Sequence, residues 1–277
     1  MANILIGTSG YQYHEWVGIV YPEGTKKKDY LSCYAGLFPT LELNYTYYRM
    51  PEAKNTAKML VDGGQNLTFA VKAHRTLTHE VISTLWEGEA KAFIMAIEPM
   101  LQAGRLETVL FQFPYSFGYT PENRVYLDKL IKYFKDVPVA VEFRKSDWYC
   151  GKVIEGMKSR QVPLVSLDMP DLPKLPPTMD VVTAPLVYIR LHGRNKETWW
   201  GASDHSRYDY LYSDMEVAAW ADRIQRVAEL ADRILVYFNN HPKGKAAKNA
   251  QTLEKMLLKM GLGGKEAEHG GKGGLPS

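Results

Sequence analysis

The chain of 277 residues is 45% hydrophobic and 23% charged, a composition that is ordinary for a globular protein of one or two domains. Its net charge of +3, from 34 basic and 31 acidic residues, is too small to indicate a nucleic-acid partner by itself, and no apolar run approaches the ~20 residues of a membrane span. The two cysteines, Cys33 and Cys150, lack metal-ligand spacing and do not suggest a disulfide framework, so we expect a cytoplasmic protein without membrane contact.

Eight short segments of the sequence are predicted to be strands. Most of them are continuous apolar runs, which are typical of parallel strands covered on both faces. In chain order they are Ile4–Ser9, Thr40–Asn44, Leu67–Ala73, Thr108–Phe113, Pro138–Phe143, Pro163–Leu167, Leu186–His192 and Ile234–Asn239.

Helical patterns separate most of the predicted strands. The clearest covers Ser213–Ala231, where Ser213 and Glu216 form a capping box ahead of one apolar stripe. The other predicted helices are Asp29–Phe38, Glu52–Asp62, Glu89–Gln102, Glu122–Phe134, Asp147–Arg160 and Lys245–Met260. This alternation predicts a single α/β domain, a (β/α)8 TIM barrel over residues 1–260, and a doubly wound open sheet is the alternative.

Two segments depart from the repeat of strand and helix. Residues 168–185 contain five prolines, so they predict an irregular connection with little helix between the sixth and seventh strands. Residues 261–277 are rich in glycine and lysine and have no apolar periodicity. They are predicted to form a flexible tail outside the barrel domain.

Polar side chains gather at the carboxyl ends of the predicted strands, where the active site of a parallel barrel lies. The seventh strand presents Arg190, His192 and Arg194 at alternate positions, which predicts that all three face the same way. Such a set is costly to bury unless carboxylates or anionic ligands lie opposite it. The other candidate site residues near strand ends are Tyr11, Glu42, Asn44, Tyr48, Lys72, Gln112, Glu142, Arg144, Trp148, Asp168, Asn239, Asn240 and Lys245.

Five motifs that contain many of these residues follow one another along the chain: Gly7–Tyr13, Glu42–Arg49, Val141–Arg144, Arg190–Arg194 and Phe238–Asn249. In this order they resemble the YecE-like proteins, the domain-of-unknown-function family 72, over residues 4–258. The resemblance implies a TIM barrel similar in architecture to the xylose isomerase and endonuclease IV superfamily, and it adds Asn249 to the candidate ligand-binding residues. It implies no reaction, because the activity of the family is not established.

The candidate residues favour an enzyme that acts on, or a protein that binds, a phosphate-bearing ligand such as a nucleic acid, a nucleotide or a sugar phosphate. Glu42 or Glu142 would be the general base and His192 a proton donor, with Asp168 as a further catalytic candidate. Aromatic residues, among them Trp199, would stack on bases or sugar rings. The cations that would hold phosphate oxygens are Lys72, Arg144, Arg190, Arg194 and Lys245.

Three alternatives remain open at this point. In a metal-dependent version, Glu42, Glu142, Asp168 and His192 would be ligands, but arginines on the same strands would compete with a cation, so no metal or other cofactor is predicted. Hydrolysis or isomerisation of a carbohydrate would use Glu42 and Glu142 as the carboxylate pair. A module that captures nucleic acid or another polyanion without catalysis is the third alternative.

Overall fold

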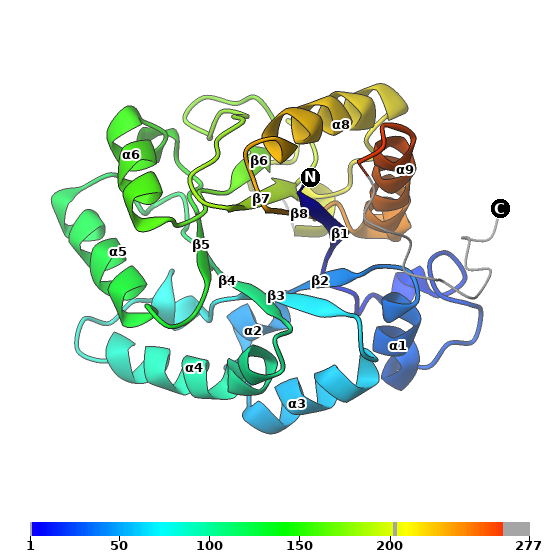
Figure 1. Cartoon of the computed structure of the whole chain (residues 1–277), viewed down its shortest axis with the longest axis horizontal. Helices are drawn as coiled ribbons and strands as arrows, with labels where there is room; N and C mark the ends of the chain where they lie inside the picture. Colours follow the sequence, from blue (N-terminus) through cyan, green and yellow to red (C-terminus); the bar gives the residue numbers. More distant parts are fainter. Residues whose placement is uncertain (1, 202–203, 263–277) are drawn as a thin grey trace.

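The computed structural model, which describes residues 2–201 and 204–262, is a barrel of parallel strands surrounded by helices (Figure 1). The strands run in the spatial order β5-β4-β3-β2-β1-β8-β7-β6, and an isolated bridge from Val141 to Leu164 joins β5 to the segment just before β6. The eight predicted strands and the TIM barrel are therefore confirmed. The strand bounds are β1 Asn3–Ser9, β2 Thr40–Leu43, β3 Thr68–Lys72, β4 Leu106–Gln112, β5 Val139–Glu142, β6 Ser166–Asp168, β7 Leu186–Leu191 and β8 Arg233–Phe238.

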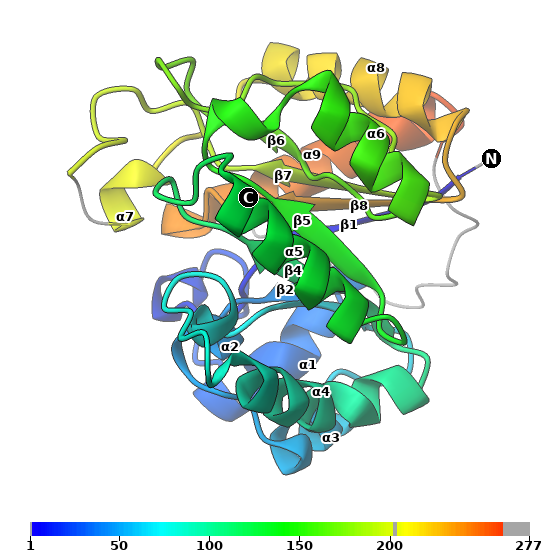
Figure 2. The ribbon, with the colours of Figure 1, turned by 90° about the vertical axis from the view of Figure 1, so that its left-hand side faces the viewer.

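The seven predicted helices are present around the outside of the barrel (Figure 1). They are α1 Tyr30–Ala35, α3 Ala53–Asp62, α4 Trp86–Gln102, α5 Pro121–Tyr133, α6 Gly151–Arg160, α8 Asp214–Ala228 and α9 Lys245–Lys259. Two single-turn helices, α2 Tyr45–Tyr48 and α7 Asp204–Arg207, were not predicted, because one turn is too short to show a helical period. Both follow strands and lie on the side of the barrel where the strands end (Figure 2).

The predicted capping box and the proline-rich connection are both as expected. Ser213 accepts a hydrogen bond from the backbone of Glu216, whose side chain in turn accepts one from the Ser213 backbone, so α8 starts at Asp214. Residues 169–185 contain no helix or strand. No helix among residues 2–201 and 204–262 is long and apolar enough to cross a membrane. The predicted tail lies outside the described residues from position 263 onward.

The side chains that point into the barrel change from apolar to polar along β3, β4, β5, β7 and β8. Buried residues of the apolar interior cluster include Ala70, Leu110, Ala140, Tyr188, Leu235 and Tyr237. Because side chains alternate along a strand, the residue two positions after an inward-facing one faces inward too. At the carboxyl ends of the strands this face presents Lys72, Gln112, Glu142, Arg190 and Asn239. The strand period thus places polar groups on top of an apolar barrel core.

Candidate functional site

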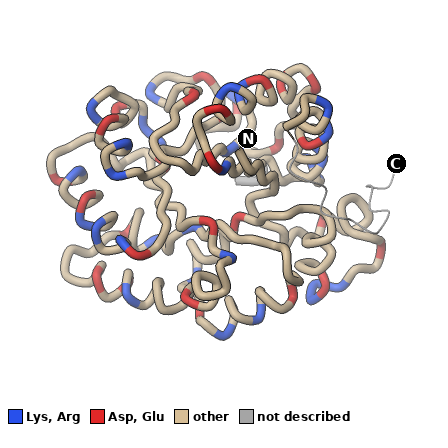
Figure 3. The backbone as a smooth tube through the Cα atoms, viewed as in Figure 1, with Lys and Arg blue, Asp and Glu red and all other residues tan. Residues whose placement is uncertain are grey.

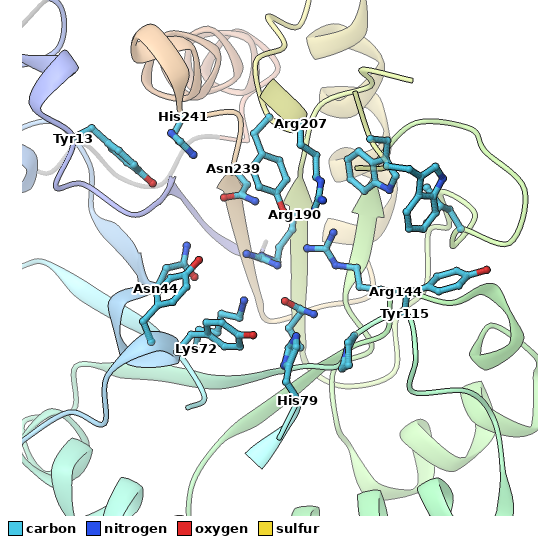
Figure 4. Close-up of a pocket in the computed structure, with 18 residues that line it drawn as sticks. Tyr13, Asn44, Lys72, His79, Tyr115, Arg144, Arg190, Arg207, Asn239 and His241 are labelled. Carbon is cyan, nitrogen blue, oxygen red and sulfur yellow. The ribbon is translucent and has the colours of Figure 1, made fainter. Parts of the chain in front are cut away.

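A cavity of about 610 Å³ opens at the carboxyl end of the barrel (Figure 4). This volume suits a small molecule, since ligand pockets span roughly 300–1,000 Å³. Its lining combines strand-end polar groups with aromatic side chains from the loops. The lining residues are Tyr13, Asn44, Tyr47, Tyr48, Lys72, His79, Gln112, Pro114, Tyr115, Arg144, Leu175, Arg190, Trp199, Trp200, Arg207, Tyr208, Asn239 and His241.

Arg190 lies at the centre of the buried polar network beneath this cavity and is only 2% exposed. Its Nη1 donates to Glu142 Oε2 at 2.5 Å, and its Nη2 donates to Glu42 Oε1 at 2.7 Å. Burial opposes the charge of this guanidinium, but Glu142 and Glu42 hold its pKa well above the usual value. One arginine from β7 therefore neutralises two carboxylates from β5 and β2.

Both carboxylate oxygens of Glu42 are engaged in hydrogen bonds. Oε1 accepts from the Ser9 hydroxyl as well as from Arg190, and Oε2 accepts from the Tyr188 hydroxyl at 2.5 Å. Asn44 extends the network by donating to Ser9 Oγ at 2.6 Å. Glu42 is fully buried, so this carboxylate anchors Arg190 and the first two strands rather than facing the cavity.

Glu142 is buried between two arginines and a histidine. Its Oε1 lies 2.5 Å from Arg144 Nε and 3.6 Å from His192 Nε2. Burial alone would raise the pKa of this carboxyl group, but Arg144 and Arg190 hold the pKa well below its usual range. Glu142 is therefore ionised at neutral pH, and as an anion it suits the role of a base or a counter-ion, not that of an acid.

His192 is fully buried next to Glu142 and does not line the cavity. Its Nδ1 lies 2.9 Å from the Asn239 side-chain amide nitrogen. With that amide as donor, Nδ1 is the acceptor and the ring proton is on Nε2, toward Glu142. Burial, with the charges of Arg144 and Arg190, holds the pKa of His192 well below its usual value, so the ring is neutral.

Lys72 ends β3 and reaches into the cavity, where its Nζ lies 4.2 Å from the centre of the Tyr47 ring (Figure 4). Burial, with the like charges of Arg190 and Arg144, lowers the pKa of Lys72 to about 7. The imidazole of His79 packs edge-on against the same tyrosine, with ring centres 4.8 Å apart. Burial, with the charges of Lys72 and Arg144, lowers the pKa of His79 to about 4, so its ring is neutral at pH 7.

Asp168 and Arg194, both site candidates from the sequence, pair with each other away from the cavity. Arg194 donates to both oxygens of Asp168, from Nε at 2.8 Å and from Nη2 at 2.6 Å, and its Nη1 donates to Glu216 at 3.0 Å. The indole of Trp220 also donates to Asp168. The strand β7 ends at Leu191, and Gly193 has a φ of 89°, so the alternation that groups Arg190 with His192 does not extend to Arg194.

Two predicted asparagines hold together the loops around α9. The Asn249 side chain accepts from the Tyr212 backbone N–H at 3.1 Å and donates to the Tyr212 carbonyl at 2.9 Å. Asn240 donates to the Tyr210 carbonyl at 2.8 Å and to Asn249 Oδ1 at 2.9 Å. Neither asparagine lines the cavity. They position the segment that follows α7.

Three further predicted residues also lie outside the cavity lining. Trp148 is buried and stacks on Phe143, with ring centres 4.1 Å apart. The Lys245 ammonium lies 2.5 Å from Asp209 Oδ1, so a carboxylate occupies the predicted anion position. Tyr11 is partly buried, and burial, with Tyr45 as the next cause, raises the pKa of its hydroxyl to about 12. Among the predicted residues, Asn44, Tyr48, Lys72, Gln112, Arg144, Arg190 and Asn239 do line it.

Sequence reasoning missed many of the residues in loops and single-turn helices that line the cavity. These are Tyr13, Tyr47, His79, Pro114, Tyr115, Leu175, Trp200, Arg207, Tyr208 and His241. Loops carry no periodic pattern, so nothing in their spacing shows which side chains turn inward. The density of aromatic residues after the predicted strands is the one signal that could have pointed to them. Trp199, predicted to stack on a ligand, does line the cavity.

The described side chains do not form a preorganised metal-binding site. Among residues 2–201 and 204–262, no three histidine, cysteine, aspartate or glutamate side chains group as metal ligands would. Glu42 and Glu142 direct their oxygens at Arg190. These carboxylates would have to leave a guanidinium before they could bind a cation.

Comparison with known proteins places this architecture in one family. The profile described as protein of unknown function DUF72 matches residues 5–269. The UPF0759 protein YunF of Bacillus subtilis (strain 168) is 28% identical over 269 residues, which cover 92% of this chain and 94% of YunF.

Solved structures of the family share the fold. A DUF72 family protein from Thermotoga maritima MSB8 superposes with a TM-score of 0.85 at 34% identity, covering 92% of this chain and 99% of that one. A DUF72 family protein from Enterococcus faecalis V583 gives a TM-score of 0.83 at 29% identity, covering 92% of this chain and 95% of that one. A xylose isomerase-like TIM barrel fused to 4-hydroxyphenylpyruvate dioxygenase is similar in fold alone, with a TM-score of 0.52 at 10% identity, covering 96% of this chain and 46% of that one. This chain belongs to the DUF72 family, whose function is unknown.

Proposed function

We propose that the cavity binds a phosphate-bearing small molecule, a nucleotide or a sugar phosphate, as the substrate of an enzyme. The observation that carries this proposal is the set of cations in the lining, Lys72, Arg144, Arg190 and Arg207, with no acidic side chain among the described lining residues. The two carboxylates beneath, Glu42 and Glu142, pair with Arg190 and Arg144 and do not line the cavity. Guanidinium groups suit phosphate because they donate two parallel hydrogen bonds to its oxygens.

Aromatic rings around the opening of the cavity are proposed to bind the base or sugar part of the ligand. Tyr48 is 63% exposed and Trp200 is 52% exposed, so both offer ring faces to a ligand. Tyr115 packs edge-on against Trp200, with ring centres 5.1 Å apart. Rings of this kind stack on bases and sugars. Cations below and rings above suit a molecule with a phosphate group and a planar or cyclic body.

The arrangement of charge favours this ligand over the alternatives. Hydrolysis of a glycoside needs one carboxylic acid that is protonated, whereas the pKa of Glu142 is held well below its usual range by Arg144 and Arg190. On the outside of the barrel, basic and acidic residues are interspersed along the helices in the view of Figure 3. The positive groups that we assign to ligand binding are therefore those of the cavity, and a long nucleic acid is the less favoured ligand.

Replacement of Arg144 tests the proposal directly. We expect Arg144→Gln to weaken binding of ribose 5-phosphate and adenosine monophosphate about 10- to 100-fold, the loss for one or two hydrogen bonds to a charged group. Isothermal titration calorimetry measures the affinities, and Arg124→Gln, which removes a guanidinium from the outer helix α5, is the matched control. Equal affinity in the two variants, or no phosphate-dependent binding in the unmodified protein, contradicts the proposal. Binding without turnover of any phosphate ester contradicts the enzymatic part.

The affinity for an anion should also depend on pH through Lys72. The pKa of Lys72 is about 7, so its ammonium is present at pH 6 and mostly lost at pH 8. Sulfate keeps its charge across this range, so its affinity should fall about tenfold from pH 6 to pH 8, in proportion to the fraction of Lys72 that is protonated. Lys72→Met should bind sulfate more weakly at pH 6 and show no such decline. A decline of the same size in the variant would assign the pH dependence to another group.

A further inference from the structure

Lys72 differs from the two arginines beside it in having no carboxylate partner among residues 2–201 and 204–262. Arg190 pairs with Glu42 and Glu142, and Arg144 pairs with Glu142. Within the described part of the chain, no carboxylate oxygen lies within 4.0 Å of the Lys72 ammonium nitrogen, the limit that defines an ion pair. Its nitrogen instead lies 4.2 Å from the centre of a tyrosine ring, inside the cavity.

The charges around Lys72 favour a neutral amine in the empty cavity. Arg190 and Arg144 are like charges that disfavour the ammonium form, and Glu142 and Glu42, which favour it, are already committed to those arginines. The pKa of Lys72, lowered to about 7 chiefly by burial, agrees with this geometry. A desolvated lysine next to other cationic groups is an activated nucleophile, because much of it carries a lone pair at neutral pH.

We propose that the Lys72 amine forms an imine with the carbonyl carbon of a phosphate-bearing aldehyde or ketone bound in the cavity. This inference rests on the proposed function and narrows its substrate class to phosphorylated carbonyl compounds. Arg144, 12% exposed, would hold the phosphate at the cavity wall while Lys72 reaches the carbonyl group. The cavity of about 610 Å³ has room for both ends of such a molecule.

Each bond change in this step is accounted for by groups of the cavity and by water. The Lys72 nitrogen attacks the carbonyl carbon, the C=O double bond opens, and water carries a proton from the attacking nitrogen to the oxygen to give a neutral carbinolamine. The hydroxyl group then takes up one proton from the solvent and leaves as water. The nitrogen lone pair forms the carbon–nitrogen double bond, which gives a protonated imine.

Trapping with pyridoxal 5′-phosphate, used as a phosphate-bearing aldehyde reagent, tests the proposal. The full-length protein is treated with the reagent at pH 7.5, the imine is reduced with borohydride, and modified lysines are located by peptide mass spectrometry. We expect Lys72 to be labelled at least about tenfold faster than the exposed Lys91, since an ordinary lysine with a pKa of about 10.4 is almost entirely protonated at this pH. Inorganic phosphate in excess should protect Lys72 alone.

Variants and a second reagent separate the outcomes. Lys72→Arg keeps a cation and Lys72→Met keeps the length of the side chain, and both should lose the fast labelling, while Lys91→Arg should retain it. Labelling spread evenly over surface lysines, or fast labelling retained in both Lys72 variants, overturns the inference. If phosphate binds by calorimetry but Lys72 stays unmodified, the imine alone is wrong. If pyridoxal without phosphate labels Lys72 equally fast and phosphate gives no protection, the phosphate assignment is wrong.

Discussion

Replacing Arg190 with alanine is expected to lower the free energy of unfolding by about 3–5 kcal/mol, the range for removing one partner of a buried ion pair. The guanidinium is 2% exposed and donates to both Glu42 and Glu142, which are themselves fully buried. Without it, Glu42 keeps the hydroxyls of Ser9 and Tyr188, and Glu142 keeps the guanidinium of Arg144 and the neutral ring of His192. Urea denaturation followed by tryptophan fluorescence measures the loss.

A charge-compensated variant serves as the control for this prediction. Arg190→Met combined with Glu42→Gln removes one cation and one anion, and Glu142 keeps its ion pair with Arg144, so most of the lost stability should return. If Arg190→Ala instead costs less than about 1 kcal/mol, the value of an exposed pair, then Arg190 does not neutralise the two carboxylates as described. It would then be a ligand contact that the fold does not need.

The strand ends show how much of the site the sequence could predict. Alternation along a strand is set by the backbone, so Glu42, Glu142 and Arg190 could be predicted to face the barrel interior. Their pairing could not be predicted, because Arg190 lies 148 residues from Glu42 and 48 residues from Glu142 in the chain. Which carboxylate meets which arginine depends on strand order and register, and those follow from packing over the whole barrel.

The loops show where prediction from the sequence ends. Trp200, Arg207 and Tyr208 line the cavity from the segment after β7, in which the single turn α7 is the one helix among the described residues. A turn or loop has no repeating period, so the inward or outward direction of each side chain depends on tertiary contacts. His241, after β8, reaches the cavity in the same way and packs face to face on Tyr13, with ring centres 4.4 Å apart. The sequence therefore predicts the site residues at strand ends more readily than those in loops and single-turn helices.

Gly193 explains why Arg194, contrary to the prediction from the sequence, does not share the inward-facing side of β7 with Arg190. Arg194 follows Arg190 and His192 at the same spacing, but Gly193 between them has a φ of 89°, a left-handed conformation that reverses the strand alternation. A Cβ atom at position 193 would also lie 2.7 Å from the Cβ of Tyr210, so the close approach of this loop requires glycine. Arg194 is thereby directed to Asp168 and away from the cavity.

Replacing Asp168 with alanine is expected to destabilise the protein by about 3 kcal/mol, the lower end of the range for removing one partner of a buried ion pair, without changing its affinity for sulfate. The lower end applies because Arg194 is 37% exposed, so water can solvate its guanidinium once the carboxylate is gone. The carboxylate is fully buried and accepts two hydrogen bonds from Arg194 and one from the Trp220 indole, which would lose its acceptor. Asp168→Asn keeps one oxygen as an acceptor, so its loss of stability should be smaller. Urea denaturation and sulfate titration of both variants separate stability from binding.

The two measurements on Asp168 decide between a structural and a catalytic role for this carboxylate. Its partners tie the end of β6 to the loop after β7 and to α8, and none of Asp168, Arg194 and Trp220 lines the cavity. A network of this kind holds the walls of the barrel mouth in place while ligand contacts come from Lys72 and Arg144. If Asp168→Ala instead keeps the stability of the unmodified protein and loses sulfate binding, Asp168 contacts the ligand and its assignment to a structural network is wrong.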